Sequence, residues 1–172
     1  MSFDAFLRRI PPPKSISEPA DNWDSIFAQL GTLLPSDYRR FIETYGTGYL
    51  AGFYIVANPF SSNRFVNLLQ RMEQIRKSQA GSPFFPDAGY KFYPDDGGLI
   101  PFMLDDNGND YFWHTIGAPD SWSVVQCEHR GSGFTEYAMS TTEYLLQIFD
   151  KKIPALASDF PLPEDEVFAA LT

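Results

Sequence analysis

The stretch DDNGNDYFWHT contains residue types that bind metal ions or exchange protons in active sites. Asp105, Asn107 and Asn109 match the first, third and fifth positions of an EF-hand calcium loop. The sixth position of that loop should be glycine and the twelfth a bidentate glutamate, but Asp110 and Ile116 stand there. Aromatic residues also occupy positions where further ligands should follow. The stretch therefore does not predict a calcium site.

The same stretch is better explained as a turn between two strands. Asn-Gly at 107–108 is a strong signal for a type I′ hairpin turn, in which both central residues have positive φ. With these two residues at the centre, Leu104 lies opposite Tyr111 and Phe102 lies opposite Trp113, so that aromatic side chains share one face of the sheet. We therefore expect a hairpin at this place.

Cys127 and His129 are the residues that most resemble a nucleophile and its base. On one strand they point to the same face, and His114 lies on the preceding strand. With 117–121 as the connecting loop, Cys127 is opposite Tyr111, and His114 is about three residues from the thiol, too far for a hydrogen bond. We interpret Cys127 as a small core residue. Two histidines and one cysteine without metal-type spacing predict no zinc site.

The remaining motifs carry no catalytic signature either. GTGYLAG lacks the lysine and the glycine spacing of a phosphate loop, and GSGF lacks the pattern of a nucleophile elbow. The carboxylates that could form a glycosidase pair lie in turns flanked by glycine or proline, where no dry pocket sets an acid apart from a base. They are Asp95, Asp96, Asp105, Asp106 and Asp110. The sequence predicts no catalytic residue, no metal and no cofactor, and a hydrolase is the less favoured alternative.

Length and composition indicate one globular domain. The chain has 172 residues, of which 44% are hydrophobic and 16% are aromatic, enough to build a substantial core. A single cysteine cannot form an internal disulfide, which favours a reducing compartment. The first residues show no signal-peptide pattern, and no apolar run approaches the roughly 18 residues of a membrane span. We expect a soluble, cytoplasmic protein without a membrane partner.

The formal charge of −9 arises in one part of the chain. Residues 78–150 contain 11 acidic side chains but only Lys91 and Arg130 as basic ones, which accounts for the whole net charge. Because phosphate contacts need a basic surface, direct binding of nucleic acid is not expected. The acidic stretch is either a solvated face that keeps the protein soluble or a surface that steers a basic partner protein.

Hydrophobic periodicity predicts an α+β fold in which helices pack against an antiparallel β-sheet. The predicted helices are 21–31, 36–46, 61–81 and 140–152, with a short helix in 163–172. Ser36 is the expected N-cap of the second helix, and Ser140 with Glu143 should form a capping box. Residues 49–58 read as one strand, and the change to period two in 98–139 predicts a β-meander. We assign 21–153 to a single domain, 1–20 to a Pro-rich lead-in and 154–172 to a tail.

Three motifs occur in an order that resembles the SUKH superfamily. Residues 30–48, LGTLLPSDYRRFIETYGTG, are similar to the hallmark Leu-Pro, acidic residue with Tyr, and Phe-containing helix that ends in Gly. Residues 97–115, GGLIPFMLDDNGNDYFWHT, match the strand, acidic turn and aromatic strand of that family. Residues 140–152 resemble its last helix, although 143–146 read Glu-Tyr-Leu-Leu where Phe-Glu-Glu-Phe-Leu is common. The resemblance covers about residues 20–152, and it is loosest in 61–93, which is longer than the family minimum.

The resemblance implies a protein-binding module. SUKH members are known mostly as bacterial immunity proteins that bind and neutralise a cognate polymorphic toxin, often a nuclease or a deaminase. A fungal branch regulates cell-wall synthesis through protein contacts. The resemblance therefore implies no catalytic residues and no cofactor, and a regulator or scaffold without a toxin partner is the alternative function. The identity of the partner and the oligomeric state do not follow from it.

We hypothesise that the partner is a basic toxin and that the acidic stretch covers its substrate groove. The carboxylates of the proposed rim are Asp95, Asp96, Asp105, Asp106 and Asp110. The proposed aromatic anchors are Tyr90, Tyr93 and Trp122, because Tyr and Trp dominate the energetic centres of interfaces. Ordinary core packing is the alternative role for each of these three aromatic side chains.

Overall fold

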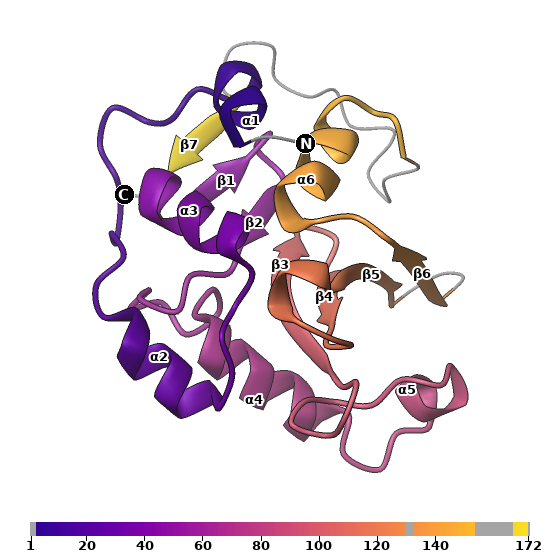
Figure 1. Cartoon of the computed structure of the whole chain (residues 1–172). Helices are drawn as coiled ribbons and strands as arrows, with labels where there is room; N and C mark the ends of the chain where they lie inside the picture. Colours follow the sequence, from indigo (N-terminus) through magenta and orange to yellow (C-terminus); the bar gives the residue numbers. More distant parts are fainter. Residues whose placement is uncertain (1–2, 130–132, 154–166, 172) are drawn as a thin grey trace.

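The computed structural model describes residues 3–129, 133–153 and 167–171, which form helices packed on one antiparallel sheet (Figure 1). The helices are α1 (Phe3–Arg9), α2 (Trp23–Leu30), α3 (Ser36–Tyr45), α4 (Leu68–Ser78), α5 (Phe84–Asp87), α6 (Thr141–Phe149) and the 3₁₀-helix η1 (Pro119–Ser121). The strands are β1 (Gly48–Leu50), β2 (Tyr54–Val56), β3 (Leu99–Asp105), β4 (Asp110–His114), β5 (Ser123–Glu128), β6 (Gly133–Tyr137) and β7 (Phe168–Ala170). The predicted α+β class is confirmed. None of the helices within the described ranges has the length and hydropathy that crossing a membrane requires.

The sheet has the strand order β6-β5-β4-β3-β2-β1-β7, and every neighbouring pair is antiparallel. Strands β3 to β6 form the predicted meander. The single strand predicted for 49–58 is wrong, because these residues form β1 and β2 with a reversal between them. Ala51 and Gly52 have φ of 55° and 64°, and this left-handed pair turns the chain back on itself.

The two faces of the sheet are covered by different sets of helices, except that α4 contributes Leu68 to one cluster and Ile75 to the other. On one face Tyr111, Trp113 and Val124 belong to the large hydrophobic cluster that also contains buried residues of α1, α2, α3 and α6. On the other face Phe112 and Val125 pack with residues of α4 and α5 in a smaller cluster. Successive residues of β4 alternate between the clusters, as the period of a strand requires. The sheet is therefore buried on both faces along its central strands.

The turn between β3 and β4 differs from the predicted type I′ geometry. Gly108 alone in this loop has a positive φ, 82°, and its amide donates to the carbonyl of Asp105 at 3.0 Å. The Asp105 carboxylate accepts hydrogen bonds from the amides of Asn107 at 2.9 Å and Asn109 at 3.0 Å. These contacts stabilise a three-residue loop at 106–108, since a short Asp side chain can bind backbone amides two and four residues onward.

The three-residue loop shifts the register between β3 and β4. Tyr111 pairs with Met103, whereas the type I′ turn predicted Leu104. A bulge between Pro101 and Met103 leaves Phe102 without a pairing partner, although its ring still stacks on Trp113 with the centroids 4.8 Å apart. The predicted residue pairs are therefore wrong, but the expected stacking of aromatic side chains on one face is present.

The helices begin where polar side chains accept hydrogen bonds from their first amides. Asn22 caps α2 by accepting from the Ser25 amide, and Asn67 caps α4 by accepting from the Gln70 amide. The predicted helix over 61–81 therefore begins only at Leu68. The expected Ser140–Glu143 capping box does not form, because the Ser140 side chain makes no capping hydrogen bond.

An aspartate from another helix takes over the capping of α6. The Oδ2 atom of Asp37 accepts hydrogen bonds from the amide of Thr142 at 2.7 Å and from its hydroxyl at 3.0 Å. The Oδ1 atom of the same side chain accepts from the Tyr38 amide at 2.8 Å. In turn, Asp120 accepts from the amide of Ser36, which is the first residue of α3 and not its N-cap. The starts of α3 and α6 are thus connected through carboxylates.

Both ends of the described chain pack on the same core. Phe6 of α1 is buried against Phe41 and Tyr45 of α3, with ring centroids 5.8 Å and 5.7 Å away. Residues 168–170 form β7 beside β1 (Figure 1), so the short helix predicted there is wrong, while 154–166 lie outside the described residues. We propose that the folding unit extends beyond 21–153 and includes α1 and β7.

Removing the Asp37 carboxylate should destabilise the protein more than removing an exposed aspartate. We expect Asp37→Ala to lower the free energy of unfolding by about 1–3 kcal/mol, because the amide and hydroxyl of Thr142 and the Tyr38 amide lose their acceptor. The matched control Asp24→Ala, an exposed first-turn residue of α2, should cost less than about 0.5 kcal/mol. Urea denaturation followed by circular dichroism measures both. Equal losses would show that the capping contact is unimportant.

A chain shortened to 21–153 should not fold to a native-like state. It loses the buried side chains of α1 and the strand that covers β1, and a Phe→Ala change at one such buried position alone typically costs about 3–5 kcal/mol. Thermal denaturation of the shortened and full chains would compare them, with Phe6→Ala in the full chain as a milder test. A cooperative transition at an unchanged temperature would contradict the extended folding unit.

Candidate functional site

The carboxylates of the predicted rim lie at opposite ends of strand β3. Asp95 and Asp96 precede the first residue of the strand, whereas Asp105 is its last residue and Asp106 follows it. The strand itself, seven residues from Leu99 to Asp105, spans about 20 Å. The predicted acidic residues therefore do not form one continuous rim.

Asp105 is buried, with 3% of its surface exposed, so the prediction that it belongs to an exposed rim is wrong. Besides the two turn amides, its carboxylate accepts hydrogen bonds from the Asn109 side chain and from the Tyr111 hydroxyl at 2.9 Å. Burial, followed by the negative charge of Asp105, raises the pKa of Tyr111, so that its hydroxyl remains a donor. The Asp105 carboxylate therefore holds the hairpin together.

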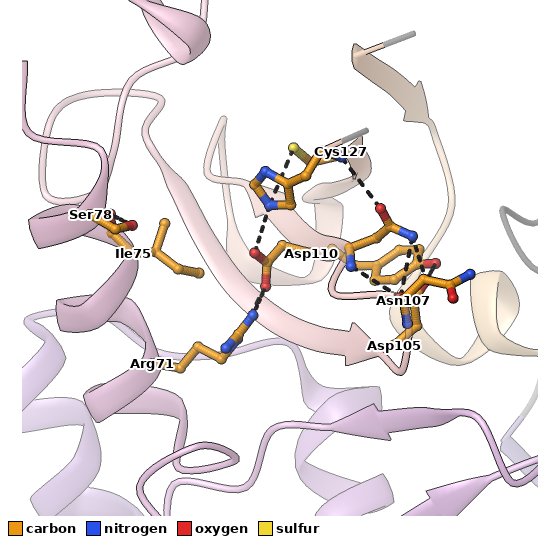
Figure 2. Close-up of polar contacts among 10 residues, drawn as sticks. Arg71, Ile75, Ser78, Asp105, Asn107, Asp110 and Cys127 are labelled. Atoms are coloured by element: carbon orange, nitrogen blue, oxygen red, sulfur yellow. Dashed lines mark hydrogen bonds and ion pairs between the residues drawn. The ribbon is translucent and has the colours of Figure 1, made fainter. Parts of the chain in front are cut away.

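Asp110 is also buried, 4% exposed, and the prediction of an exposed rim position is wrong for it too. Figure 2 shows its carboxylate facing Arg71 of α4, whose Nε atom lies 3.1 Å from Oδ1. On the other side, Oδ2 lies 2.9 Å from Nε2 of His129. The carboxylate thus ties α4 and the end of β5 to the start of β4.

The predicted aromatic anchors are buried or partly buried and contact neighbouring residues of the protein. Trp122 is 6% exposed, so its assignment as an exposed anchor is wrong, and its indole NH donates to the Gly117 carbonyl at 3.1 Å. Tyr93 is partly buried, and its hydroxyl donates to the Leu30 carbonyl at 2.8 Å. Tyr90 is partly buried as well and lies against His114, with ring centroids 5.4 Å apart.

These contacts bring three loops together in what we call the loop end, residues 30–36, 93–98 and 115–121. The Tyr93 hydroxyl connects the second loop to the first, and the Ser36–Asp120 hydrogen bond connects the first to the third. The Thr115 hydroxyl donates to the Gly98 carbonyl at 2.7 Å and so joins the third loop to the second. Asp95 and Asp96 are exposed in this loop end. Sequence reasoning missed the first loop, because no local pattern signals a contact between residues 30 and 93.

A cysteine nucleophile is disfavoured by the surroundings of Cys127. The side chain is buried in the smaller hydrophobic cluster, as the interpretation as a core residue predicted, and it pairs with Asp110 rather than with Tyr111. Burial, followed by the negative charge of Asp110, raises the pKa of the Cys127 thiol to about 12. His129 Nε2 lies 3.9 Å from the sulfur but is engaged by Asp110. The reactive thiolate is therefore strongly disfavoured near neutral pH.

A second cluster has the residue types of a hydrolase triad but not its geometry. Ser123 donates to the same oxygen of Glu136 that His114 contacts at 2.9 Å, so the imidazole does not hold the hydroxyl. Partial burial raises the pKa of Glu136, but hydrogen bonds from Ser123 and His114 outweigh it and leave the pKa below its usual range. A carboxylate with a lowered pKa is a poor general acid or base at neutral pH.

The described part of the chain contains no group of three or more His, Cys, Asp or Glu side chains arranged to hold a metal ion. The Asp110 carboxylate contacts His129, but it also faces the Arg71 guanidinium. A metal cation at this place would be repelled by the guanidinium. The contacts around Asp110 are thus those of a structural ion pair.

Comparison with known protein families shows to which superfamily the chain belongs. The family model described as SMI1-KNR4 cell-wall, SUKH_6, matches residues 20–145, which is more than half of the chain. The protein therefore belongs to the SUKH superfamily, as its motifs predicted. That family consists generally of non-enzymatic immunity or regulatory proteins. No curated protein and no solved structure matches the chain significantly.

Removing the Asp110 carboxylate should destabilise the fold. In Asp110→Ala the Arg71 side chain, which is 16% exposed, remains in place without its partner, and we expect a loss of about 3 kcal/mol in the free energy of unfolding. Asp106→Ala, in the exposed part of the same hairpin, should cost less than about 0.5 kcal/mol. Chemical denaturation compares the two variants. Similar stabilities would refute the structural role of the ion pair.

Proposed function

We propose that this protein is an immunity protein that binds and neutralises a cognate bacterial toxin through the loop end. Membership of the SUKH superfamily supports a protein-binding role. The observation that carries the proposal is that the side chains of Asp95 and Asp96 are exposed and unpaired. Both are exposed, they are adjacent, and neither side chain has a hydrogen bond or ion pair to any residue that the structure describes. Together with Asp106, which is exposed at the opposite end of β3, they are the part of the predicted rim that remains free to meet a partner.

The other acidic side chains of the stretch 78–150 differ in whether they have partners within the protein. Several of them are occupied within the protein, as turn acceptors, helix caps or ion-pair partners. These are Asp105, Asp110, Asp120, Glu136 and Asp150. A carboxylate that faces a cation, such as Asp110 beside Arg71, contributes little to long-range attraction, whereas an exposed carboxylate that accepts only from a neutral amide, such as Asp120, keeps its charge. The negative potential of the loop end therefore comes from Asp95, Asp96 and Asp120.

The partner that fits this surface is a basic protein. Opposite charges steer the encounter of two proteins and raise the association rate, and salt screens this attraction over about 8 Å at physiological ionic strength. A toxin that acts on nucleic acid has a basic substrate groove, and an acidic loop end would cover such a groove. A cytoplasmic location, which the single cysteine favours, is part of the same proposal.

A regulator or scaffold of the same fold is the second candidate function. The description of the matching family as a cell-wall family favours it. A regulator would also act by binding proteins, so both candidates use the same kind of surface. They differ in the partner, because an immunity protein protects cells against one toxin, whereas a regulator binds components of the host cell.

The partner can be captured by affinity purification of the tagged protein from its native cells, followed by mass spectrometry. We expect one toxin polypeptide at near-equal stoichiometry, and we expect co-expression of the protein to restore the growth of cells that make this toxin. Host regulatory proteins in its place would support the second candidate. Absence of any bound polypeptide would contradict both.

Charge reversal at the loop end should slow the binding of the captured toxin. We expect Asp95→Lys with Asp96→Lys to lower the association rate about tenfold or more at low salt and to weaken its salt dependence. The matched control Asp106→Lys changes an exposed aspartate at the opposite end of β3 and should have a smaller effect. Stopped-flow or surface plasmon resonance at several salt concentrations measures the rates. An equal effect of Asp106→Lys would argue against the loop end.

A further inference from the structure

Strand β6 is an edge of the sheet (Figure 1). It pairs with β5 through five consecutive residues, and none of the other strands in the described part of the chain pairs with it. In an antiparallel pair, alternate residues direct both their NH and their CO groups away from the neighbouring strand. The outer side of β6 therefore presents backbone donors and acceptors to which a further strand can bind.

The sequence of β6 lacks the features that most directly prevent such pairing. Lysine, proline or a bulge commonly protects an edge strand, but β6 is GFTEY and its register is regular. Phe134, Thr135 and Tyr137 are of the aromatic and β-branched types that favour strands. The carboxylate of Glu136 contacts His114 and accepts a hydrogen bond from Ser123. Glu136 therefore leaves no unpaired charge to repel an incoming strand.

A cleft of about 470 Å³ lies between the start of β6 and helix α5. Its lining consists of three aromatic residues and three others, namely Phe84, Tyr90, Phe134, Asp87, Ala88 and Gly133. The ring centroid of Phe134 is 5.1 Å from that of Phe84 and 5.0 Å from that of Tyr90.

The charge of this cleft selects a cation. Asp87 is the charged residue of the lining; it is exposed, and no residue that the structure describes forms an ion pair with it. Lys91, although near in sequence, is not part of the lining. The face of an aromatic ring attracts a cation, and so does a carboxylate. A lysine or arginine side chain therefore fits the cleft, with its stem on the rings and its charge at Asp87.

The position of Phe134 connects the edge to the cleft, because this residue belongs to β6 and also lines the cleft. Side chains that lie opposite each other on neighbouring strands are about 5 Å apart on one face of a sheet. A segment that pairs with the outer side of β6 therefore places the side chain opposite Phe134 at the cleft. Main-chain hydrogen bonds along an edge supply affinity, and a pocket for a side chain supplies specificity.

A basic partner fits this edge better than a second copy of the chain. Strand β6 and the cleft belong to the stretch 78–150, which accounts for the net charge of −9, so two copies would repel each other here. The edge also adjoins the loop end through Tyr90. The Tyr90 ring centroid lies 5.0 Å from that of Phe134 and 5.4 Å from that of His114, the residue directly before Thr115 of the loop end.

We propose that β6 is a docking edge, to which the toxin adds an extended segment as a further strand of the sheet, with a lysine or arginine of that segment in the cleft beside Asp87. This inference rests on the proposed toxin-binding function. It adds a second contact surface beside the loop end and the chemistry of the segment that binds there.

Amide hydrogen exchange, followed by NMR on the full chain, tests the strand pairing. In the free protein, the amides of 133–137 that point away from β5 should exchange rapidly, because no strand covers them. Saturation with the toxin captured by affinity purification should slow their exchange about tenfold or more. The opposite edge strand β7 is the matched control, and its outward amides should change little.

Affinity measurements with the same toxin test the cleft. Asp87→Lys should weaken binding about fivefold or more, because it replaces the carboxylate that attracts the basic side chain. The matched control Asp24→Lys changes the net charge equally at an exposed position of α2 and should change the affinity less than about twofold. Circular dichroism and thermal denaturation establish that both variants are folded, which we expect because both side chains are exposed.

The outcomes separate this inference from the proposed function. If the toxin binds while exchange in 133–137 stays rapid, β6 is not the docking edge and the immunity function stands. Protection in the free chain would overturn the inference as well, since at all concentrations it means that the chain covers its own edge, and at high concentration alone that a second copy does. Equal affinities of the Asp87 and Asp24 variants would overturn the basic side chain in the cleft. If no polypeptide binds the natural chain, the docking edge and the immunity function both fail.

Discussion

The carboxylate of Asp37 is the contact on which the helical layer depends. It accepts hydrogen bonds from the Tyr38 amide in α3 and from the amide and hydroxyl of Thr142 at the start of α6. The first amides of a helix have no partner within the helix, so a buried helix start needs an acceptor from elsewhere. With α6 held by this contact, Thr141 receives a hydrogen bond from the Trp113 indole at 3.0 Å, and the helix is anchored to the sheet.

The same chemistry governs the acidic half of the chain. Asp105 binds turn amides, Asp120 binds the first amide of α3, and Asp110 faces Arg71 and His129. A short carboxylate satisfies several donors at once, so these side chains hold turns and layers together, and the buried Asp105 and Asp110 contribute little to a charged surface. Asp95 and Asp96 are exposed, and neither carboxylate has a hydrogen bond or ion pair to a residue that the structure describes.

The loop end lies where the sheet meets the α2–α3 connection. Tyr93 and Trp122, which lie behind the surface, give their polar hydrogens to the carbonyls of Leu30 and Gly117. Buried aromatic residues with a satisfied polar group fix loops at a small entropic cost, since few side-chain torsions are lost. A partner that binds at these loops would therefore require little rearrangement of them.

The sequence by itself determined the α+β class, the meander and the superfamily, because these follow from local periodicity and from motifs within short segments. It also indicated Cys127 as a core residue. Only the tertiary structure decided that Asp105 and Asp110 are buried, that 49–58 form two strands, and that 168–170 complete the sheet. The burial of a side chain depends on neighbours far away in the chain, such as the partners 63, 84 and 105 residues apart that join the loop end and the helix starts. The local sequence does not indicate such neighbours, because the sequence around a carboxylate in a turn is the same whether water or an arginine contacts the carboxylate.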